Sequence, residues 1–282
     1  MDTRGEGMRT GAVVALKPFE LAKSRLSGLA DPLRQRLAWT MAVDTLAALS
    51  AAVDRVVVVG DQPALQSRLR RSGLSVDVLG EPTPLGMNGA LTLGAEALVA
   101  RGCTLVLACV GDLPAVGPES IRRVLAAGQG RGPGRWFVAD ASGVGTTMLM
   151  ARETALDPRF QGPSAAAHES SGAVPLTDDI LGAPVPEARR DVDTEDDLVE
   201  AGRLGLGGTT AALLDPATGR PGRYDSVTVT EQPEGREQTV ISSRGHRLVL
   251  APSALQDGLR HARQGQRLHA VVTSEAVLAA WL

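Results

Sequence analysis

From Ala12 to about Leu204, short apolar runs alternate with longer amphipathic segments. The short runs are rich in Val and Leu and have the length of buried strands; they lie at Ala12–Leu16, Arg55–Gly60, Val76–Leu79, Thr104–Val110, Trp136–Asp140 and Thr147–Met150. The longer segments carry apolar residues at helical spacing, at Pro32–Ala52, Pro63–Ser72, Met87–Arg101 and Pro118–Ala127. This alternation predicts an α/β fold in which a mostly parallel sheet is covered by helices and ligands bind at the carboxyl ends of the strands.

The pattern changes after a predicted helix at Thr194–Leu204, where Gly205-Leu206-Gly207-Gly208 is typical of a linker. Beyond it the apolar runs are short and alternating, at Ser226–Thr230, Gln238–Ser242, Arg247–Leu250 and Leu268–Thr273. We therefore expect one α/β domain over residues 1–206, and a linker with a small β-barrel-like domain over residues 207–282. The second region loosely resembles cold-shock-like barrels.

Composition argues against several classes of function. Hydrophobic residues make up 43% of the 282 residues, which is enough for a globular core. The aromatic fraction of 2% and the net charge of −3 argue against a surface for nucleic acid or anionic membrane. Residues 1–11 lack an apolar signal core, and no apolar run reaches the ~20 residues that span a bilayer. We expect a cytoplasmic protein with no nucleic-acid or membrane partner.

Lysine occurs only at Lys17 and Lys23, and the rest of the 29 Lys and Arg residues are arginine. Both lysines follow the first predicted strand, and Arg25 lies close behind them. A chain that otherwise uses arginine has kept two places for a compact, mobile ammonium rather than a planar fork, and a phosphate group at the mouth of an α/β fold would be such a place. The pair predicts a phosphate site at the edge of the sheet, with an accidental pair on a solvated loop as the alternative.

Three aspartates stand where predicted strands end. Asp112 directly follows the run Leu105–Val110, and Asp191 and Asp193 are spaced to point to one face of an extended chain. Carboxylate oxygens in such a place suit Mg²⁺, which takes one or two protein carboxylates together with substrate phosphates. The alternatives are a turn or helix-capping role for Asp112, and an N-cap role for Asp193 in the following helix.

Glycine and hydroxyl residues form a further group. Gly143-Val144-Gly145-Thr146-Thr147 is followed by Arg159-Phe160-Gln161-Gly162-Pro163-Ser164. Glycines let a backbone approach a ligand closely, and Thr or Ser hydroxyls can hold a small anion. Each segment taken singly is also typical of an ordinary turn, and Asn88, which begins a predicted helix, could simply cap it.

In chain order these segments resemble the phosphoenolpyruvate and 2-phospho-L-lactate guanylyltransferase family of coenzyme F-420 biosynthesis, in its actinobacterial branch. The similarity covers about residues 11–204. It is carried by Lys17 with Ala22-Lys23-Ser24-Arg25-Leu26, Gly111-Asp112-Leu113-Pro114, Gly145-Thr146, Arg159-Phe160 with Ser164, His168-Glu169-Ser170-Ser171-Gly172-Ala173, and Asp191-Val192-Asp193-Thr194.

The resemblance implies a GT-A-like nucleotidyltransferase fold. It also implies transfer of GMP from GTP to phosphoenolpyruvate, giving enolpyruvyl-2-diphospho-5'-guanosine and pyrophosphate, with 2-phospho-L-lactate as the alternative acceptor. By position, Asp112, Asp191 and Asp193 would hold Mg²⁺. Thr146 and Ser164 would contact the acceptor, and Asn88, Gln161 and Gly162 complete the predicted substrate site. One position departs from the family, because Gln161 stands where glycine usually follows the Arg-Phe pair.

The chemistry that we expect needs no general base, because an acceptor phosphate is already anionic at neutral pH. Catalysis then consists of aligning that phosphate with the α-phosphorus of GTP and stabilising the departing pyrophosphate. Lys23 and Arg25 are predicted to stabilise the triphosphate, and Lys17 to face the reacting phosphates.

Two rival interpretations stay open. A molybdenum-cofactor type of nucleotidyltransferase would open with a glycine-rich loop, and no glycine occurs between Leu16 and Ser27. A non-catalytic binding module would not need three aspartates at strand ends. The sequence leaves open the residues that recognise guanine and the oligomeric state, including a homodimer.

Overall fold

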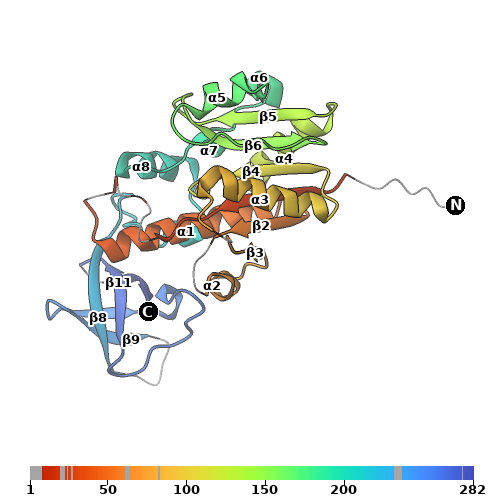
Figure 1. Cartoon of the computed structure of the whole chain (residues 1–282). Coiled ribbons are helices and arrows are strands. Elements are labelled where there is room, and N and C mark those ends of the chain that lie inside the picture. Colours follow the sequence, from red (N-terminus) through yellow and green to blue (C-terminus); the bar gives the residue numbers. More distant parts are fainter. Residues whose placement is uncertain are drawn as a thin grey trace.

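Two sheets organise the chain in this computed structural model (Figure 1). The structure describes residues 8–19, 23, 25–26, 28–60, 64–81, 83–231, 237–274 and 276–282. The N-terminal sheet has seven strands and the C-terminal sheet has five. The fold class predicted from the sequence is confirmed, namely a mostly parallel, helix-covered sheet followed by a small β domain.

The N-terminal sheet has the strand order β3-β2-β1-β4-β6-β5-β7. Its strands are β1 (Thr10–Ala15), β2 (Arg55–Val59), β3 (Asp77–Leu79), β4 (Leu105–Cys109), β5 (Gly134–Ala139), β6 (Thr146–Arg152) and β7 (Val174–Pro175). Strands β3, β2, β1 and β4 pair in parallel, whereas β6 runs antiparallel to β4 and β5. The carboxyl ends of the parallel strands therefore share one edge, where the polar loops meet.

Helices cover both faces of this sheet. The helices are α1 (Asp31–Ser50), α2 (Leu65–Arg71), α3 (Gly86–Ala100), α4 (Pro118–Gln129), α5 (Ser164–Ser170), α6 (Asp178–Leu181), α7 (Pro186–Arg189), α8 (Glu195–Leu204) and α9 (Gly208–Ala211). Along β1, Ala12 and Val14 join the apolar cluster under α1 and α4, while Val13 joins the cluster under α3. Burial on both faces explains why the strands are continuous apolar runs.

Close packing of α3 on the sheet depends on a glycine. A Cβ atom at Gly94 would lie 2.3 Å from Cγ2 of Val13. The predicted helix Pro63–Ser72 corresponds to α2, although Pro63 itself lies outside the described residues. Within the part of the chain that the structure describes, no helix combines the length and the apolar character needed to cross a membrane.

The C-terminal sheet is an antiparallel half-barrel with the order β10-β9-β8-β11-β12. Its strands are β8 (Arg223–Glu231), β9 (Gln238–Ser242), β10 (Arg247–Leu250), β11 (Arg267–Val272) and β12 (Val277–Trp281). A bridge between Val249 and Ala276 joins its two ends, as in a small, partly open barrel. The sequence pattern predicted four of these strands and missed β12, which lacks apolar–polar alternation because it is buried along most of its length.

The half-barrel packs against α1. Leu33, Leu37 and Met41 of that helix share an apolar cluster with Val271 and Trp281 of the half-barrel.

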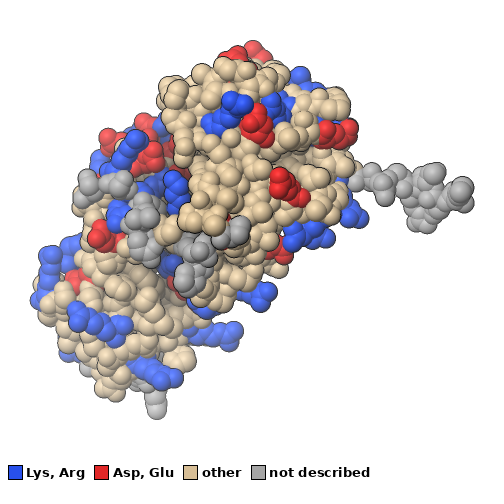
Figure 2. Space-filling view, in the orientation of Figure 1, with Lys and Arg blue, Asp and Glu red and all other residues tan. Residues whose placement is uncertain are grey.

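A polar contact supports this packing at the same interface. The Arg36 side chain, only 1% exposed, pairs with Asp257 at 2.6 Å and lies over the Trp281 ring at 5.2 Å. On the face shown in Figure 2, basic and acidic side chains are intermixed rather than gathered into one patch, which fits the net charge of −3.

Candidate active site at the carboxyl ends of the strands

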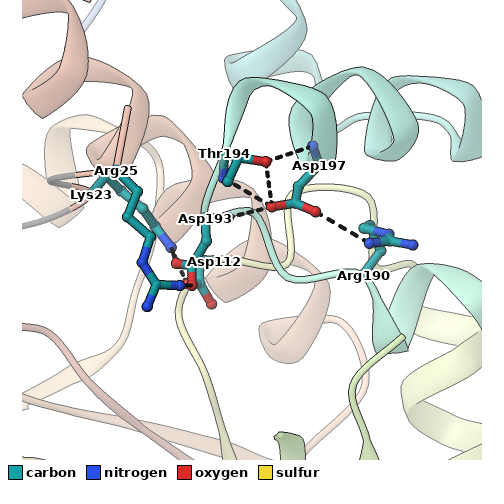
Figure 3. A network of polar contacts seen from close by, with 7 residues as sticks. All are labelled: Lys23, Arg25, Asp112, Arg190, Asp193, Thr194 and Asp197. Carbon is teal, nitrogen blue, oxygen red and sulfur yellow. Dashed lines mark hydrogen bonds and ion pairs between the residues drawn. The ribbon is translucent and has the colours of Figure 1, made fainter. Parts of the chain in front are cut away.

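Three segments that are distant in sequence converge beyond β4 (Figure 3). The Lys23 ammonium contacts Oδ2 of Asp112 and donates to Oδ1 of Asp193 at 2.9 Å. Nη1 of Arg25 donates to the other oxygen of Asp193 at 3.2 Å. The lysine segment and two of the three predicted aspartates therefore form one cluster, although Lys23 and Asp112 are 89 positions apart.

Backbone hydrogen bonds fix the loops that carry the aspartates. The Val192 N–H donates to the carbonyl of Asp112 at 3.1 Å, which ties the loop after β4 to the segment Asp191–Asp193. The Leu113 N–H donates to the buried hydroxyl of Thr45 in α1 at 3.1 Å. The core helix thus sets the position of Asp112.

Asp193 is not the cap of the helix that follows it. Thr194 is the N-cap of α8, and its hydroxyl accepts from the Asp197 N–H. The Asp197 carboxylate in turn accepts from the N–H groups of Thr194 and Asp193 (Figure 3). The capping alternative for Asp193 is therefore wrong, and its carboxylate is left to Lys23 and Arg25.

The carboxylates of this site shift the pKa values of Asp191 and Lys23. Burial raises the pKa of Asp191 to about 7, and the charges of Asp112 and Asp193 add to the rise. Burial would lower the pKa of Lys23, but the same two carboxylates more than offset it and hold the pKa above its ordinary value. Both shifts have one cause, since negative charge is concentrated where water is scarce.

The oxygen donors fit a hard divalent cation. Asp112 Oδ1 is buried and has no hydrogen-bond partner among the residues that the structure describes. Buried carboxylate oxygens of this kind are suitable ligands for such an ion. Among the described residues, however, no three acidic, histidine or cysteine side chains are grouped at metal-binding spacing. Lys23 lies between Asp112 and Asp193 instead. Joint metal binding by Asp112, Asp191 and Asp193 remains a prediction.

A second polar cluster contains Thr146 and Asn88. The Thr146 hydroxyl is 2.9 Å from Nδ1 of His168, whose Nε2 accepts from the Arg159 N–H at 2.8 Å. Asn88 Oδ1 accepts from the next backbone N–H, that of Phe160, at 2.9 Å. Asn88 lies in the first turn of α3 but is not its N-cap, which is Leu85. Its side chain therefore holds the loop before α5.

The turn before α5 has an unusual backbone. Gln161 has φ 122° and Gly162 has φ 58°, both in the region that favours glycine. Ser164, the first residue of α5, is buried, and the Ala165 N–H donates to the carbonyl of Val144 at 3.1 Å. The chain keeps a glycine-like conformation at Gln161, where the family usually has glycine. This turn packs beside the loop that leads to Thr146.

Lys17 lies two residues beyond the end of β1 and is exposed. Its predicted role toward the reacting phosphates stays a prediction.

Sequence reasoning missed Asp140 and His168. Asp140 directly follows β5, and its charge adds to the rise in the pKa of Asp191. Its Oδ1 accepts from the Val144 N–H at 3.0 Å, and a Cβ on Gly145 would lie 2.5 Å from its Oδ2. The rule that singled out Asp112, an aspartate directly after a strand, would also have found Asp140. For His168 the only signal was its place in the family motif.

A cavity of about 580 Å³ lies elsewhere, between α1, α2 and the half-barrel. Arg36, Arg68, Arg71 and Trp281 help to line it, and none of the predicted site residues does. Asp257 is the one aspartate among the lining residues that the structure describes.

A comparison with protein families identifies the class of protein to which this fold belongs. A family model described as the MobA-like NTP transferase domain matches residues 32–278. The match covers most of the chain, and the fold has the strand-end polar loops of a nucleotide-binding α/β protein. The chain belongs to the MobA-like NTP transferase family.

Curated relatives narrow the assignment. A phosphoenolpyruvate guanylyltransferase from Salinispora arenicola is 40% identical over 215 residues, covering 75% of this chain and 96% of the relative. Proteins of the same name from Mycobacterium sp. (strain KMS) and Thermomonospora curvata are 41% and 42% identical, covering 74% and 71% of this chain and 93% and 86% of their own lengths. The chain belongs to the phosphoenolpyruvate guanylyltransferase family, which confirms the resemblance found in its motifs.

Proposed function

We propose that this protein transfers GMP from GTP to phosphoenolpyruvate, forming enolpyruvyl-2-diphospho-5'-guanosine and releasing pyrophosphate in coenzyme F-420 biosynthesis. The observation that carries the proposal is the cluster of Lys23, Asp112 and Asp193 at the carboxyl ends of the strands. The names of the curated relatives support the choice of substrates. A reaction between GTP and a phosphorylated metabolite favours a cytoplasmic location.

Asp112, Asp191 and Asp193 would hold Mg²⁺ in this proposal. The ion, when bound, supplies the positive charge that lets two anionic reactants approach and that neutralises the leaving pyrophosphate. Lys23 now satisfies Asp112 and Asp193, so it would be released from them toward the triphosphate. Asp191, whose pKa burial raises to about 7, would be held in its charged form.

The protein's own contribution to catalysis is alignment and charge stabilisation. An acceptor phosphate is already a nucleophile at neutral pH, so the site needs no base. Lys17, Lys23 and Arg25 would bind the phosphates of GTP and stabilise the charge that develops on pyrophosphate. In enzymes that transfer phosphoryl groups, positioning of the reactants and electrostatic stabilisation generally supply most of the catalysis.

Thr146, Ser164 and Asn88 would bind the acceptor, together with the backbone of Gln161 and Gly162. The positive φ angles of the last two residues present main-chain groups that a right-handed turn would hide. We also propose the division into an α/β domain over residues 1–206 and a linker with a β domain over residues 207–282.

The direct test is to incubate the purified protein with GTP, Mg²⁺ and either phosphoenolpyruvate or 2-phospho-L-lactate, and to follow pyrophosphate. Faster release with phosphoenolpyruvate is expected. Preference for 2-phospho-L-lactate would overturn the acceptor assignment, and no release with either acid would overturn the nucleotidyl transfer itself. Coupling to an enzyme that consumes the product guards against product inhibition.

The metal assignment is tested by Asp112→Asn, which removes the charge of the most central carboxylate. We expect turnover to fall by at least a hundredfold, as for loss of a main electrostatic contact, with an unchanged unfolding midpoint. Asp179→Asn, on the exposed face of α6, is the matched control and should keep full activity. Full activity of Asp112→Asn would remove this residue from the metal site.

A further inference from the structure

The His168 ring is held on both sides. It is fully buried, and it is the only histidine of the α/β region. Nε2 accepts from the Arg159 N–H at 2.8 Å, and Nδ1 lies 2.9 Å from the Thr146 hydroxyl. The rings of Phe137 and Phe160 pack on it with centroid distances of 5.8 and 5.1 Å. The imidazole therefore has one orientation.

These contacts decide where the imidazole carries its proton. A backbone N–H can only donate, so Nε2 has no proton of its own. A neutral ring then carries its proton on Nδ1, which lies 2.9 Å from Thr146 Oγ1 and also interacts with the Ser164 backbone. A protonated Nδ1 cannot accept from the Thr146 hydroxyl, so between these two groups only Nδ1 can donate. Burial lowers the pKa of His168 to about 4, so the ring is neutral over the physiological range.

The donor on Nδ1 constrains the hydroxyl that receives it. Thr146 Oγ1 accepts from His168, so its own proton is left to be donated elsewhere. Asn88 follows the same logic one residue along the loop. Its Oδ1 accepts from the Phe160 N–H, which leaves the amide NH₂ as a donor. The Arg159 N–H, acting through His168, thus leaves the Thr146 hydroxyl as a donor, and the neighbouring Phe160 N–H leaves the Asn88 amide as a donor.

We propose that His168 is a positioning residue that locks the Thr146 hydroxyl as a hydrogen-bond donor to the anionic group of the acceptor. The inference rests on the proposed function, because it takes Thr146 as an acceptor-binding residue. A phosphate or carboxylate oxygen can only accept hydrogen bonds, and a donor fixed in advance binds it without a loss of rotational freedom.

The first experiment measures the tautomer in the wild-type protein and does not depend on activity. Long-range ¹⁵N–¹H correlation spectra of the ¹⁵N-histidine-labelled protein at pH 7 should show one neutral ring protonated on Nδ1. His168→Asn identifies the signal by removing it. A ring protonated on Nε2, or an imidazolium, would overturn the proposal.

The second experiment measures equilibrium binding of phosphoenolpyruvate by calorimetry, with Kd rather than turnover as the readout. Thr146→Val and His168→Phe should each weaken binding about tenfold, the scale of one hydrogen bond to a charged group. The double variant should be no weaker than Thr146→Val, because His168 acts through that hydroxyl. Additive losses, or unchanged binding in the single variants, would overturn the proposal.

Two further variants separate positioning from folding. His168→Asn keeps an amide donor near the position of Nδ1 and should recover part of the affinity, whereas Thr146→Ser keeps the hydroxyl and should stay within about threefold of wild type. A merely structural role would lower the unfolding midpoint of His168→Phe without changing the Kd for phosphoenolpyruvate. If His168→Phe does not fold, the proposal is tested by the Kd of His168→Asn for phosphoenolpyruvate and by the tautomer of His168 in the wild-type protein.

Failure of this inference differs from failure of the proposed function. Absence of pyrophosphate release from a wild-type protein that binds phosphoenolpyruvate would remove the reaction and leave the role of His168 standing. Normal turnover with an Nε2–H tautomer would remove the role of His168 and leave the reaction. A wild-type protein that does not bind phosphoenolpyruvate would overturn both.

Discussion

Burial and fixed charged partners shift the pKa values of individual polar residues of this site away from those in water. Lys23 is nearly buried, yet two carboxylates keep it charged. Asp191 is pushed toward its neutral form, and the His168 imidazole is kept neutral by burial. The fold imposes each state by removing water around one group and fixing the partners of another. These are single-residue effects that stability and titration experiments can reach directly.

His168 should make stability depend on pH. Its folded pKa of about 4 lies below the ordinary 6.5, so this histidine contributes stability that is present above pH 6.5 and is lost as pH falls toward 4. Between pH 7 and pH 5 the loss should be ~2 kcal/mol. Urea unfolding of the wild type and of His168→Asn at pH values between 7 and 5 measures how steeply the free energy of unfolding falls with pH in each protein. The exposed His261→Asn is the control, and equal slopes in all three proteins would contradict the prediction.

Gln161 should cost stability through its backbone. At φ 122° a side chain other than glycine is strained. Gln161→Gly should therefore stabilise the protein by ~1 kcal/mol, the strain relieved less the extra freedom of glycine in the unfolded chain. Gly162→Ala, at φ 58°, should act in the opposite direction. Chemical denaturation at pH 7 checks both, and a destabilised Gln161→Gly protein would show that the conformation is unstrained.

At the scale of elements, the site depends on how the loop between α7 and α8 is anchored. Asp191 and Asp193 stand on either side of Val192, which is fully buried. Val192 belongs to the apolar cluster that also contains Val271 and Trp281 of the half-barrel. The segment that carries the two carboxylates is therefore held by a close-packed core to which α1, α8 and the half-barrel all contribute.

Val192→Ala should loosen this anchor. We expect a loss of ~2 kcal/mol in the free energy of unfolding, from the methyl groups removed and the space left. We also expect a higher Mg²⁺ concentration for half-maximal activity, because the two aspartates lose their fixed spacing. Val229→Ala, in the separate core of the half-barrel, is the matched control. It should lose similar stability without a change in the Mg²⁺ requirement, and equal Mg²⁺ requirements in both variants would contradict the prediction.

At the scale of the whole molecule, the half-barrel is part of the scaffold of the site. Its contact with α1 combines an apolar cluster with the ion pair between the buried Arg36 and the partly exposed Asp257. Asp257 also accepts from Nε1 of Trp39 at 3.3 Å, and Trp39 packs edge-on against Phe19 at 5.4 Å. Phe19 lies between the two lysines in sequence. Packing thus connects the half-barrel to the segment that carries Lys17 and Lys23.

Asp257→Asn should leave the Arg36 charge buried without its partner. Removal of one member of a buried pair is expected to cost ~3 kcal/mol. Asparagine tolerates the positive φ of Asp257 (56°), so the change isolates the charge. Asp178→Asn removes the partner of the more exposed Arg189 and should cost under ~1 kcal/mol. Similar losses for the two variants in urea unfolding would show that the interface does not depend on this pair.

Some of this architecture was readable in the amino-acid pattern. The six strands predicted for the α/β domain all form, because each is a short apolar run whose identity is local. All but the edge strand β3 are buried along most of their length or in their central residues. The sequence pattern did not predict β7, because this strand has only two residues. It did not predict β12 either, because a strand that is buried along most of its length lacks the alternation of apolar and polar residues. The rule that found Asp112 after β4 overlooked Asp140 after β5. The strand expected before Asp191 and Asp193 is wrong, because the two residues lie in the loop between α7 and α8. His168 and Gln161 had no local pattern from which their contacts or backbone could be inferred.

By itself, the sequence determined the α/β class, the positions of most elements, the family motifs and the residue types available at strand ends. Those properties depend on hydrophobic spacing and on neighbours along the chain. Only the tertiary structure decided that Lys23 pairs with Asp112 and Asp193, that Thr194 rather than Asp193 caps α8, and that His168 holds Thr146. Such choices depend on burial and on partners distant in sequence, since a polar group that loses water takes whichever partner the packed fold places within reach.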